Sequence, residues 1–237
     1  MNAPPPSLLL ASRSPRRALL LREAGFEVET IESGIDDRGL APGRVTIAQW
    51  TAALAHLKAR AALAHLKARA DTHPRAETHA HDESSNRGMR PESRHALLIG
   101  ADTVVEVDGR IIGQPRDAAD ARRIIRDLAD REHDVITGVS VIDLPTGGED
   151  LFVDTSRVLV GPIADASIDE YIASGRWRGK AGAYNLSERL AAGWPIQYRG
   201  DPATVMGLPM QRLTIYLARR WGVAPTSTPL ERTGRPG

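Results

Sequence analysis

The first 31 residues follow the order strand, tight turn, helix, strand. Residues 8–11 form a short apolar run typical of a buried strand, and residues 26–31 alternate apolar and polar side chains like a half-exposed strand. Between them we predict a helix over residues 15–24, with the Ser14 hydroxyl as its N-cap and Gly25 as its stop. This order is the opening of an α/β domain.

The length and charge of the chain limit its size class and its partners. Its 237 residues can bury one substantial core, so we predict a single domain over residues 1–224 and a flexible tail over residues 225–237. The formal charge of +1, from 31 basic and 30 acidic residues, gives no global field that would attract nucleic acid or an acidic membrane. Aromatic residues, on which bases stack, make up only 4%. We therefore expect neither partner.

The residue types that are missing exclude further classes of site. The chain has no cysteine, which rules out disulfides, zinc–thiolate sites and thiol nucleophiles. The apolar run at residues 7–11 is far too short to span a membrane, and the long apolar stretch of a signal peptide is absent. These features predict a soluble, cytoplasmic protein.

A long Ala- and Leu-rich helix is predicted over residues 47–70, and it contains a repeat. Residues 53–61 read ALAHLKARA, and residues 62–70 repeat them letter for letter. Nine residues at about 100° each turn the second copy to the opposite side of the helix. If the helix is straight, Lys58 and Lys67 therefore cannot both point at one ligand.

A polar segment over residues 71–95, with four histidines, is predicted to be a mobile insertion loop. A histidine-rich tract can bind metal, but these histidines lack periodic spacing and disorder is the better interpretation. The remaining predicted strands cover residues 96–107, 110–112, 134–144 and 151–160, and the remaining helices cover residues 117–130, 167–173 and 209–221.

The turn between the first strand and the first helix reads Ser12-Arg13-Ser14-Pro15-Arg16-Arg17. A helix start presents free N–H groups and positive potential, and serine hydroxyls and arginine forks add donors that match phosphate oxygens. The turn is thus a candidate phosphate site. The alternative is an ordinary helix cap with solvated arginines.

Asp102 interrupts an otherwise apolar strand in the sequence Gly100-Ala101-Asp102-Thr103. A carboxylate there is costly unless it is paired or faces a cleft. It could hold a divalent cation or take a proton from an attacking water molecule. A structural aspartate bonded to backbone amides is the alternative.

Two further candidates are weaker. Asp36 and Asp37 could share a magnesium ion, although acidic residues are common in turns. Residues 179–184, GKAGAY, could approach a ligand closely and offer Lys180 as a positive charge. This segment is not a P-loop, because its glycine spacing is wrong and Ala181 replaces the Ser or Thr that binds magnesium. A flexible surface turn is its alternative.

Taken in order, several segments resemble the Maf family of nucleotide pyrophosphatases, also called septum formation inhibitors. They are LLLASRSPRRALLLREAGF, ALAHLKARA, IGADTVVEVDGRIIGQPRDAADARRI, HDVITGV, GKAGAY and VMGLPM. The resemblance implies an α/β fold similar to that of inosine triphosphate pyrophosphatases, with a mixed, elongated sheet flanked by helices in two lobes around a cleft. It also implies hydrolysis of a nucleoside triphosphate to a monophosphate and diphosphate, a divalent cation (Mg²⁺ or Mn²⁺), removal of noncanonical or surplus nucleotides, and a homodimer.

The resemblance also assigns roles to residues of this chain. Asp102 matches the proton acceptor, and Arg16 and Thr103 match positions tied to substrate choice. The remaining matches are Ser12 and Arg17 as phosphate-site residues, Lys58 as the helix lysine and Lys180 as the lysine of the late loop. We expect Asp102, together with Asp37, to hold the metal ion while water attacks the α-phosphorus.

Three departures from the family pattern bear on activity. Gln114 stands where the family has a lysine, which removes a positive charge that a triphosphate would use. Asp37 replaces the glutamate of the usual Asp-Glu pair. Ser187 stands where the uridine and thymidine triphosphate enzymes carry their specificity glutamine.

Two alternatives therefore stay open. SPRR and ADT resemble the thymidine/uridine triphosphate subgroup, which we favour, whereas the segment over residues 200–209 is closer to the 7-methylguanosine triphosphate subgroup. A catalytically weak, nucleotide-binding regulator of cell division is the second alternative, and Gln114 is the feature that favours it.

Overall fold

The computed structural model describes residues 7–37, 40–72 and 97–221. Its strands are β1 Ser7–Ala11, β2 Glu27–Ile31, β3 Leu97–Val107, β4 Arg110–Ile112, β5 Arg131–Asp143, β6 Glu149–Val160 and β7 Ile196–Arg199. Its helices are α1 Pro15–Glu23, α2 Ile47–Thr72, α4 Ala118–Leu128, α5 Asp165–Ala173, the 3₁₀ turn η1 Ala181–Ala183, α6 Leu186–Ala191, α7 Pro202–Met206 and α8 Met210–Trp221.

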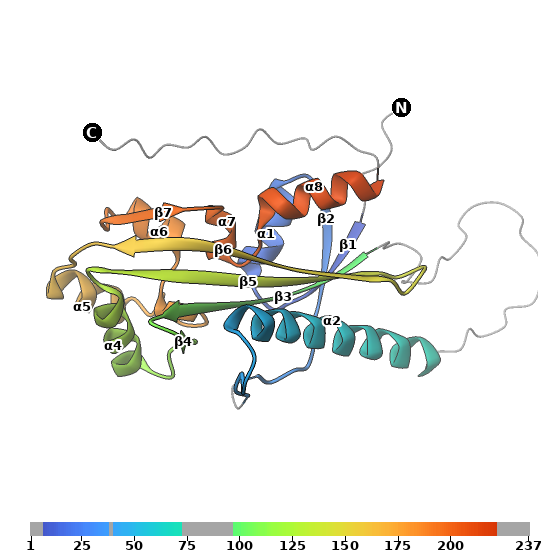
Figure 1. Ribbon diagram of the computed structural model, residues 1–237, viewed down its shortest axis with the longest axis horizontal. Coiled ribbons are helices and arrows are strands. Elements are labelled where there is room, and N and C mark those ends of the chain that lie inside the picture. Colours follow the sequence, from blue (N-terminus) through green and yellow to red (C-terminus); the bar gives the residue numbers. More distant parts are fainter. Residues whose placement is uncertain (1–6, 38–39, 73–96, 222–237) are drawn as a thin grey trace, which may run out of the picture.

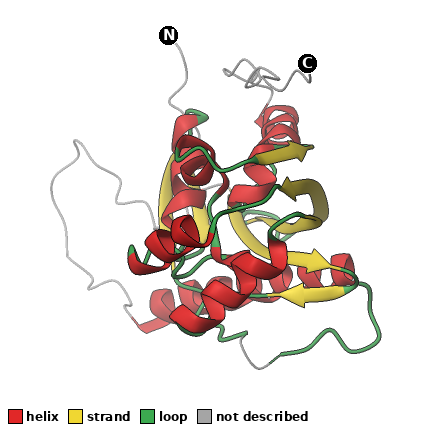
Figure 2. Cartoon of the chain, turned by 90° about the vertical axis from the view of Figure 1, so that its left-hand side faces the viewer, coloured by secondary structure: helices red, strands yellow, loops and turns green. Residues whose placement is uncertain are grey.

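The described strands form one mixed sheet in the order β2-β1-β3-β5-β6-β7, with β4 paired to β3. β1 is parallel to both of its neighbours, whereas β3, β5, β6 and β7 pair antiparallel in succession. The long strands β3, β5 and β6 run along the length of the molecule (Figure 1). Figure 2 shows helices on both sides of the strands. The predicted α/β class, with an elongated mixed sheet, is confirmed.

The two-residue alternation of β1 and β3 sorts their side chains onto two faces. Leu8 and Leu10 join a core with α1 and α8, whereas Leu9 and Ala11 join a core with α2. Figure 1 shows α2 below the sheet and α1 and α8 above it. On β3, Ala101 belongs to the α1/α8 face, so Gly100 and Asp102 belong to the α2 face. The direction of the Asp102 side chain is thus set by strand geometry.

Two glycines allow α2 to lie directly on the sheet. A Cβ atom at Gly100 would lie 2.6 Å from the Ala55 carbonyl oxygen and 2.7 Å from the Ala59 Cβ atom. A Cβ atom at Gly138, the β5 partner of Asp102, would lie 2.6 Å from the Thr51 carbonyl oxygen. Neither position has room for a side chain, so the backbone of α2 packs directly on the sheet beside Asp102.

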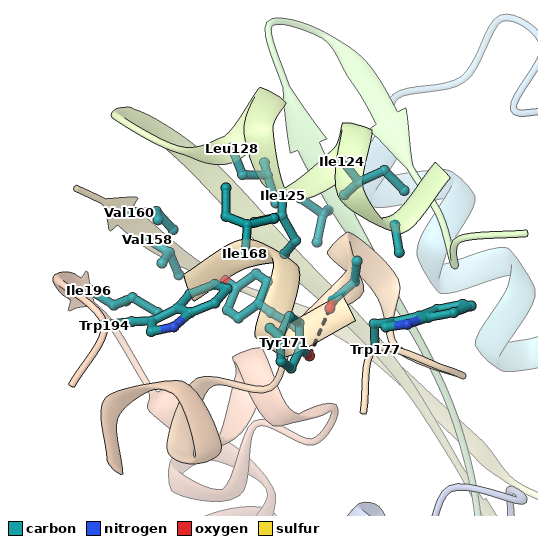
Figure 3. Close-up of a cluster of buried hydrophobic side chains, with 14 of the residues drawn as sticks. Ile124, Ile125, Leu128, Val158, Val160, Ile168, Tyr171, Trp177, Trp194 and Ile196 are labelled. Atoms are coloured by element: carbon teal, nitrogen blue, oxygen red, sulfur yellow. Dashed lines mark hydrogen bonds between the residues drawn. The ribbon is translucent and has the colours of Figure 1, made fainter. Parts of the chain in front are cut away.

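A separate core fills the other end of the sheet (Figure 3). Ile125 of α4, Val158 of β6 and Tyr171 of α5 are buried there together with Trp194. The Tyr171 hydroxyl donates to the Ala183 carbonyl oxygen at 2.9 Å and so fixes the turn η1. The sheet therefore carries helices and an apolar core at each end, in agreement with the two predicted lobes.

Most of the predicted elements are confirmed. Asp108 and Gly109 both have positive φ angles, 49° and 76°, as the predicted two-residue hairpin requires. Asp117 caps α4 by accepting a hydrogen bond from the Asp120 amide, and the predicted apolar face of this helix is buried. The sequence did not predict three short elements, α6, β7 and α7.

One cap prediction is wrong. Ser14 occupies the N-cap position of α1 but makes no capping hydrogen bond through its side chain. The Ser12 hydroxyl instead accepts a hydrogen bond from the Ser14 amide at 3.1 Å. Ser14 is therefore the N-cap by position only, and Ser12 binds its amide from the preceding turn. The predicted insertion loop, apart from residues 71 and 72 at the end of α2, and the predicted tail lie outside the described residues.

Within the described residues, none of the helices combines the length and the apolar character needed to cross a membrane.

Candidate functional site

The candidate site lies at an opening in the edge of the sheet. β1 pairs with β3 as far as Gly100, and β4 pairs with β3 from Val105 onward. Among the described residues, no strand pairs with Ala101–Val104 on this side. Asp102 and Thr103 lie in this opening. The chain leaves β1 here and turns into α1, so the arginine-bearing turn lies beside the same edge.

Asp102 is buried, with its side chain 9% exposed, and pairs with a lysine of α2. The Lys58 Nζ atom lies 2.5 Å from Asp102 Oδ1 and 2.6 Å from Asp37 Oδ2. One ammonium group therefore joins two carboxylates from distant parts of the sequence. The predicted residues Asp37, Lys58 and Asp102 are brought together in the structure.

Only the first copy of the repeat contributes to this cluster. Lys58 is mostly covered and faces Asp102, whereas Lys67 is exposed. The alanines reverse in the same way, because Ala59 is fully buried and Ala68, nine residues later, is exposed. The predicted half-turn offset between the copies is confirmed, and Lys58 is the lysine that reaches the site.

Arg17 binds four groups across the opening of β3. Its Nε atom donates to the Gly207 carbonyl oxygen at 2.8 Å, and its Nη2 atom donates to Thr103 Oγ1 at 2.9 Å. Its Nη1 atom donates to the Ala101 carbonyl oxygen at 2.8 Å and to Ser12 Oγ at 3.2 Å. The predicted residues Ser12, Arg17 and Thr103 therefore share one hydrogen-bond network.

This network continues into the sheet through threonine hydroxyls. Thr103 Oγ1 lies 2.9 Å from the oxygen of Thr137, its direct partner on β5. Thr137 is fully buried and donates to the Thr204 carbonyl oxygen at 2.9 Å. Thr204 in turn lies 2.5 Å from Asp154 of β6. The network thus connects α1 and β3 with β5, β6 and α7.

Arg16, the neighbour of Arg17, lies close to Glu188 and Tyr171. Its Nε atom is buried and has no hydrogen-bond partner among the described residues. Burial lowers the pKa of Arg16, and the nearby Glu188 and Tyr171 offset only part of this effect. A guanidinium that has lost hydration without a full set of partners favours a bound anion.

Lys180 and Glu188 form the ion pair next to Arg16. The Lys180 Nζ atom lies 2.8 Å and 3.0 Å from the two carboxylate oxygens of Glu188. Burial lowers the pKa of Lys180, and the hydrogen bond from Glu188 partly restores it. Glu188 was missed in the sequence, and its only signal was its position eight residues after Lys180.

Ser187 is exposed and belongs to the cap of α6. Its hydroxyl donates to Asn185 Oδ1 at 2.8 Å, and the same oxygen accepts the Glu188 amide at 3.2 Å. Gln114 lies elsewhere, in a hollow of about 430 Å³ between the β3–β4 hairpin and α4. Arginines and aspartates line this hollow together, and Arg123 is paired there with Asp120 and Asp127.

The donor set suits a hard divalent cation in part. Asp37 and Asp102 offer carboxylate oxygens, which Mg²⁺ and Mn²⁺ prefer, and Lys58 already shows that both can bind one cation. Among the described residues, however, no group of three or more histidine or acidic side chains could enclose a metal. Substrate phosphates and water would have to complete the coordination, as is usual for Mg²⁺.

Comparisons with known proteins identify the family of this chain. The family model of the Maf-like proteins matches residues 7–220. The dTTP/UTP pyrophosphatase of Salinibacter ruber is 37% identical over 206 residues, which cover 87% of each chain. The dTTP/UTP pyrophosphatase of Chromobacterium violaceum is 37% identical over 214 residues, or 89% of this chain and 93% of that one. That of Dictyoglomus turgidum is 32% identical over 90% of this chain and 95% of its own. The chain described here belongs to the Maf family.

Proposed function

We propose that this protein hydrolyses a pyrimidine nucleoside triphosphate, dTTP or UTP, to the monophosphate and diphosphate. The relatives named above carry this activity in their names. The observation that carries the proposal is the carboxylate of Asp102, held by Lys58 in an opening of the sheet beside the arginine-bearing turn. A carboxylate next to cations is the arrangement that water attack on a polyphosphate requires.

Asp102 is the proton acceptor in this proposal. Water attacks the α-phosphorus, the bond from this phosphorus to the oxygen that bridges it to the β-phosphorus breaks, and the proton of the water passes to the Asp102 carboxylate. Diphosphate leaves with the electrons of the broken bond. The Lys58 ammonium, 2.5 Å from Asp102, keeps the carboxylate oriented and offsets negative charge that accumulates on the phosphates.

Asp102 and Asp37 would hold the divalent cation, which when bound offsets phosphate charge and lowers the barrier to attack. Lys58 occupies the position between these carboxylates in the free protein, so it must move aside or share them when the cation and the triphosphate bind.

Arg16 and Lys180 supply the positive charge on the other side of the turn. The Nε atom of Arg16 is buried without a partner among the described residues, so a shift of this side chain would bring an unused donor to a phosphate or base oxygen. Lys180 is bound to Glu188, and a substrate could draw either group away from that pair. Ser12 contributes a hydroxyl at the start of α1. Ser187 replaces the specificity glutamine, so its side chain is too short to make the same contact with a base.

The first experiment is diphosphate release from a panel of triphosphates with Mg²⁺ or Mn²⁺, namely dTTP, UTP, GTP, ATP and 7-methyl-GTP. We expect dTTP and UTP to be the fastest. Asp102→Asn keeps the shape and removes the charge, and we expect it to lose about 10³-fold in kcat. Near-normal turnover by Asp102→Asn would refute the mechanism.

The same panel separates the alternatives. Fastest turnover of 7-methyl-GTP would favour the guanine subgroup, and tight binding without release of diphosphate would favour a regulator. Gln114→Lys restores the charge that the family carries at this position. We expect it to raise kcat/KM if the loss of that charge limits the reaction. The cytoplasmic location, the homodimer and the single domain over residues 1–224 stay predictions.

A further inference from the structure

We propose that Arg17 and Thr103 are positioning residues, which hold the opening of β3 in shape and do not contact the substrate. This inference rests on the proposed function, and it reverses the role that family resemblance suggests for Arg17. Thr103 would then influence substrate choice by positioning β3 and not by contact with the base. Four observations support it.

The first observation is that Arg17 is already occupied. A guanidinium has five N–H donors, and all three nitrogens of Arg17 donate to protein oxygens in four hydrogen bonds. One N–H of Nη2 remains, so a phosphate could bind Arg17 through the usual pair of hydrogen bonds only by replacing a contact that joins α1 to β3 or α7. The neighbouring Arg16 has a buried Nε atom without a partner among the described residues, so it is the arginine with a donor to offer.

The second observation is the direction of the hydroxyl chain. Thr137 has a single hydroxyl hydrogen, which it donates to the Thr204 carbonyl oxygen. The contact between Thr103 and Thr137 must therefore be donated by Thr103. The Thr103 oxygen also accepts a hydrogen bond from Arg17. Thr103 consequently has no hydroxyl hydrogen left for a nucleotide.

The third observation is the alternation of β3. Asp102 points toward α2, where it meets Lys58, whereas Thr103 points to the opposite face, where it meets Arg17 and Thr137. A substrate phosphate next to the Asp102 carboxylate lies on the other side of the strand from the Thr103 hydroxyl. What the two residues share is the backbone between them, and Arg17 binds that backbone at the Ala101 carbonyl oxygen.

The fourth observation explains the glycine of the VMGLPM segment. Gly207 ends α7 with a φ of 112°, which only glycine adopts readily, and its carbonyl oxygen accepts the Arg17 Nε hydrogen bond. A Cβ atom at this position would lie 3.0 Å from Arg17 Nε. Gly207 therefore holds the Arg17 guanidinium in place. A substitution at Gly207 should displace Arg17 and so change the position of Asp102.

The test compares Arg17→Gln with its neighbour Arg16→Gln. For Arg17→Gln we expect kcat to fall about 10²-fold, while the Kd of the non-hydrolysable α,β-imido-dUTP changes less than about threefold. For Arg16→Gln we expect the Kd to rise more than about tenfold. An equal rise in Kd for both variants would show that Arg17 holds the nucleotide, and would overturn the proposal.

Variants that leave Arg17 intact guard against a folding defect. Thr137→Val removes the buried hydroxyl that binds Thr103 and the Thr204 carbonyl oxygen. Gly207→Ala disturbs the contact between Gly207 and Arg17. Both are expected to lower kcat about tenfold with an unchanged Kd, whereas Thr103→Ser keeps the chain and retains kcat. Normal kcat in Thr137→Val together with normal kcat in Gly207→Ala would refute the positioning role.

A measurement without nucleotide separates this proposal from the proposed function. Arg17→Gln and Thr137→Val do not touch each other directly, yet both belong to one chain of hydrogen bonds. In the ligand-free protein we expect each to lower Tm by about 2–6 °C and the double variant to lose less than the sum. Additive losses would overturn the inference even if the wild-type protein is fully active. Absence of any triphosphate hydrolysis by the wild-type protein would instead remove the proposed function.

Discussion

The two copies of ALAHLKARA in α2 have the same nine residues and different surroundings. In the first copy, Ala55 and Ala59 are fully buried against Gly100, and Lys58 reaches Asp102. In the second copy, the equivalents Ala64 and Ala68 are exposed, and so is Lys67. The composition of a helical segment therefore does not determine its role. Its rotation relative to the sheet does.

The start of the helix sets this rotation. Thr51 is fully buried and its carbonyl oxygen faces Gly138, so nothing larger than the backbone fits between them. If α2 slid along the sheet by nine residues, the second copy would lie where the first lies now, and Arg60 would take the place of Thr51. A long charged side chain cannot occupy that position without a partner. The chain consequently has one register for α2, in which Lys58 and not Lys67 serves the site.

The largest difference between the copies should appear in turnover. Lys58→Met removes the ammonium that holds Asp102 and Asp37, and we expect kcat/KM for dTTP to fall about 10²- to 10³-fold. Lys67→Met, the matched control in the second copy, should leave kcat/KM unchanged. Steady-state kinetics of both variants checks this, and equal losses would mean that the second copy also contributes to the site.

A stability comparison comes next. Ala59 packs so tightly on Gly100 that a Cβ atom added to Gly100 would lie 2.7 Å from the Ala59 Cβ atom. Ala59→Leu adds three carbon atoms at this contact and should cost about 1–3 kcal/mol of unfolding free energy. Ala68→Leu places the same side chain on an exposed part of the helix and should change stability by less than about 0.5 kcal/mol. Urea unfolding measures both. Equal costs would contradict the assigned rotation.

Removal of one copy sharpens the comparison further. Deletion of residues 53–61 and deletion of residues 62–70 give the same chain, because the copies are identical. This chain keeps the anchored start of α2, and with it Lys58, but loses the packing of Ala62, Leu63 and Leu66 against β1 and β3. We expect kcat within about threefold of the full chain and a stability loss of about 1–2 kcal/mol. Loss of turnover on the scale of Lys58→Met would show that the second copy is needed.

The smallest difference between the two copies is expected for the stability contributed by their equivalent arginines, Arg60 and Arg69. Arg60 donates to Glu149 at 2.9 Å, with His56 and Ser140 as the other partners of that carboxylate. Burial raises the pKa of Glu149, but the hydrogen bonds from these three side chains outweigh it and the net pKa is lowered. We expect Arg60→Ala to lose about 0.5 kcal/mol at pH 7 and Arg69→Ala less, as measured by urea unfolding.

The pH dependence of this pair has a definite sign. A carboxyl group whose pKa is lower in the folded state stabilises the fold above its unfolded pKa, and this stabilisation disappears as the pH falls through the folded value. The gap between wild type and Arg60→Ala should therefore close below a pH of about 4. A gap that stays constant down to pH 3 would mean that Arg60 stabilises α2 by packing and not through Glu149.

The sequence predicted what depends on local patterns. The buried strand over residues 8–11, the Asp108-Gly109 hairpin and the Asp117 cap all follow from nearest neighbours in the chain. It missed α6, β7 and α7, which have only 6, 4 and 5 residues. Elements this short gain their stability from tertiary contacts. The caps Asn185 and Asp201 were their visible signals, since both accept amide hydrogen bonds at helix starts.

The site was predictable to a similar extent. Asp102 and Asp37 were candidates from their positions in a strand and a loop, Lys58 came from family resemblance, and the structure brings the three together at one ammonium group. The path from Thr103 to Thr137 and Thr204 was not predictable, because it depends on the pairing register of β3 with β5 and on the position of α7. Serine and threonine side chains show their partners only in three dimensions.

The short opening in β3 also affects solubility. An unpaired strand edge can recruit strands of other molecules and so promote aggregation. On this side of β3 only Ala101–Val104 lacks a neighbouring strand among the described residues. β1 and β4 pair with the segments before and after it, and Arg17 binds the Ala101 carbonyl oxygen. A segment this short can form few backbone hydrogen bonds with a strand of another molecule. The protein can thus leave strand backbone unpaired next to the Asp102 carboxylate without promoting aggregation.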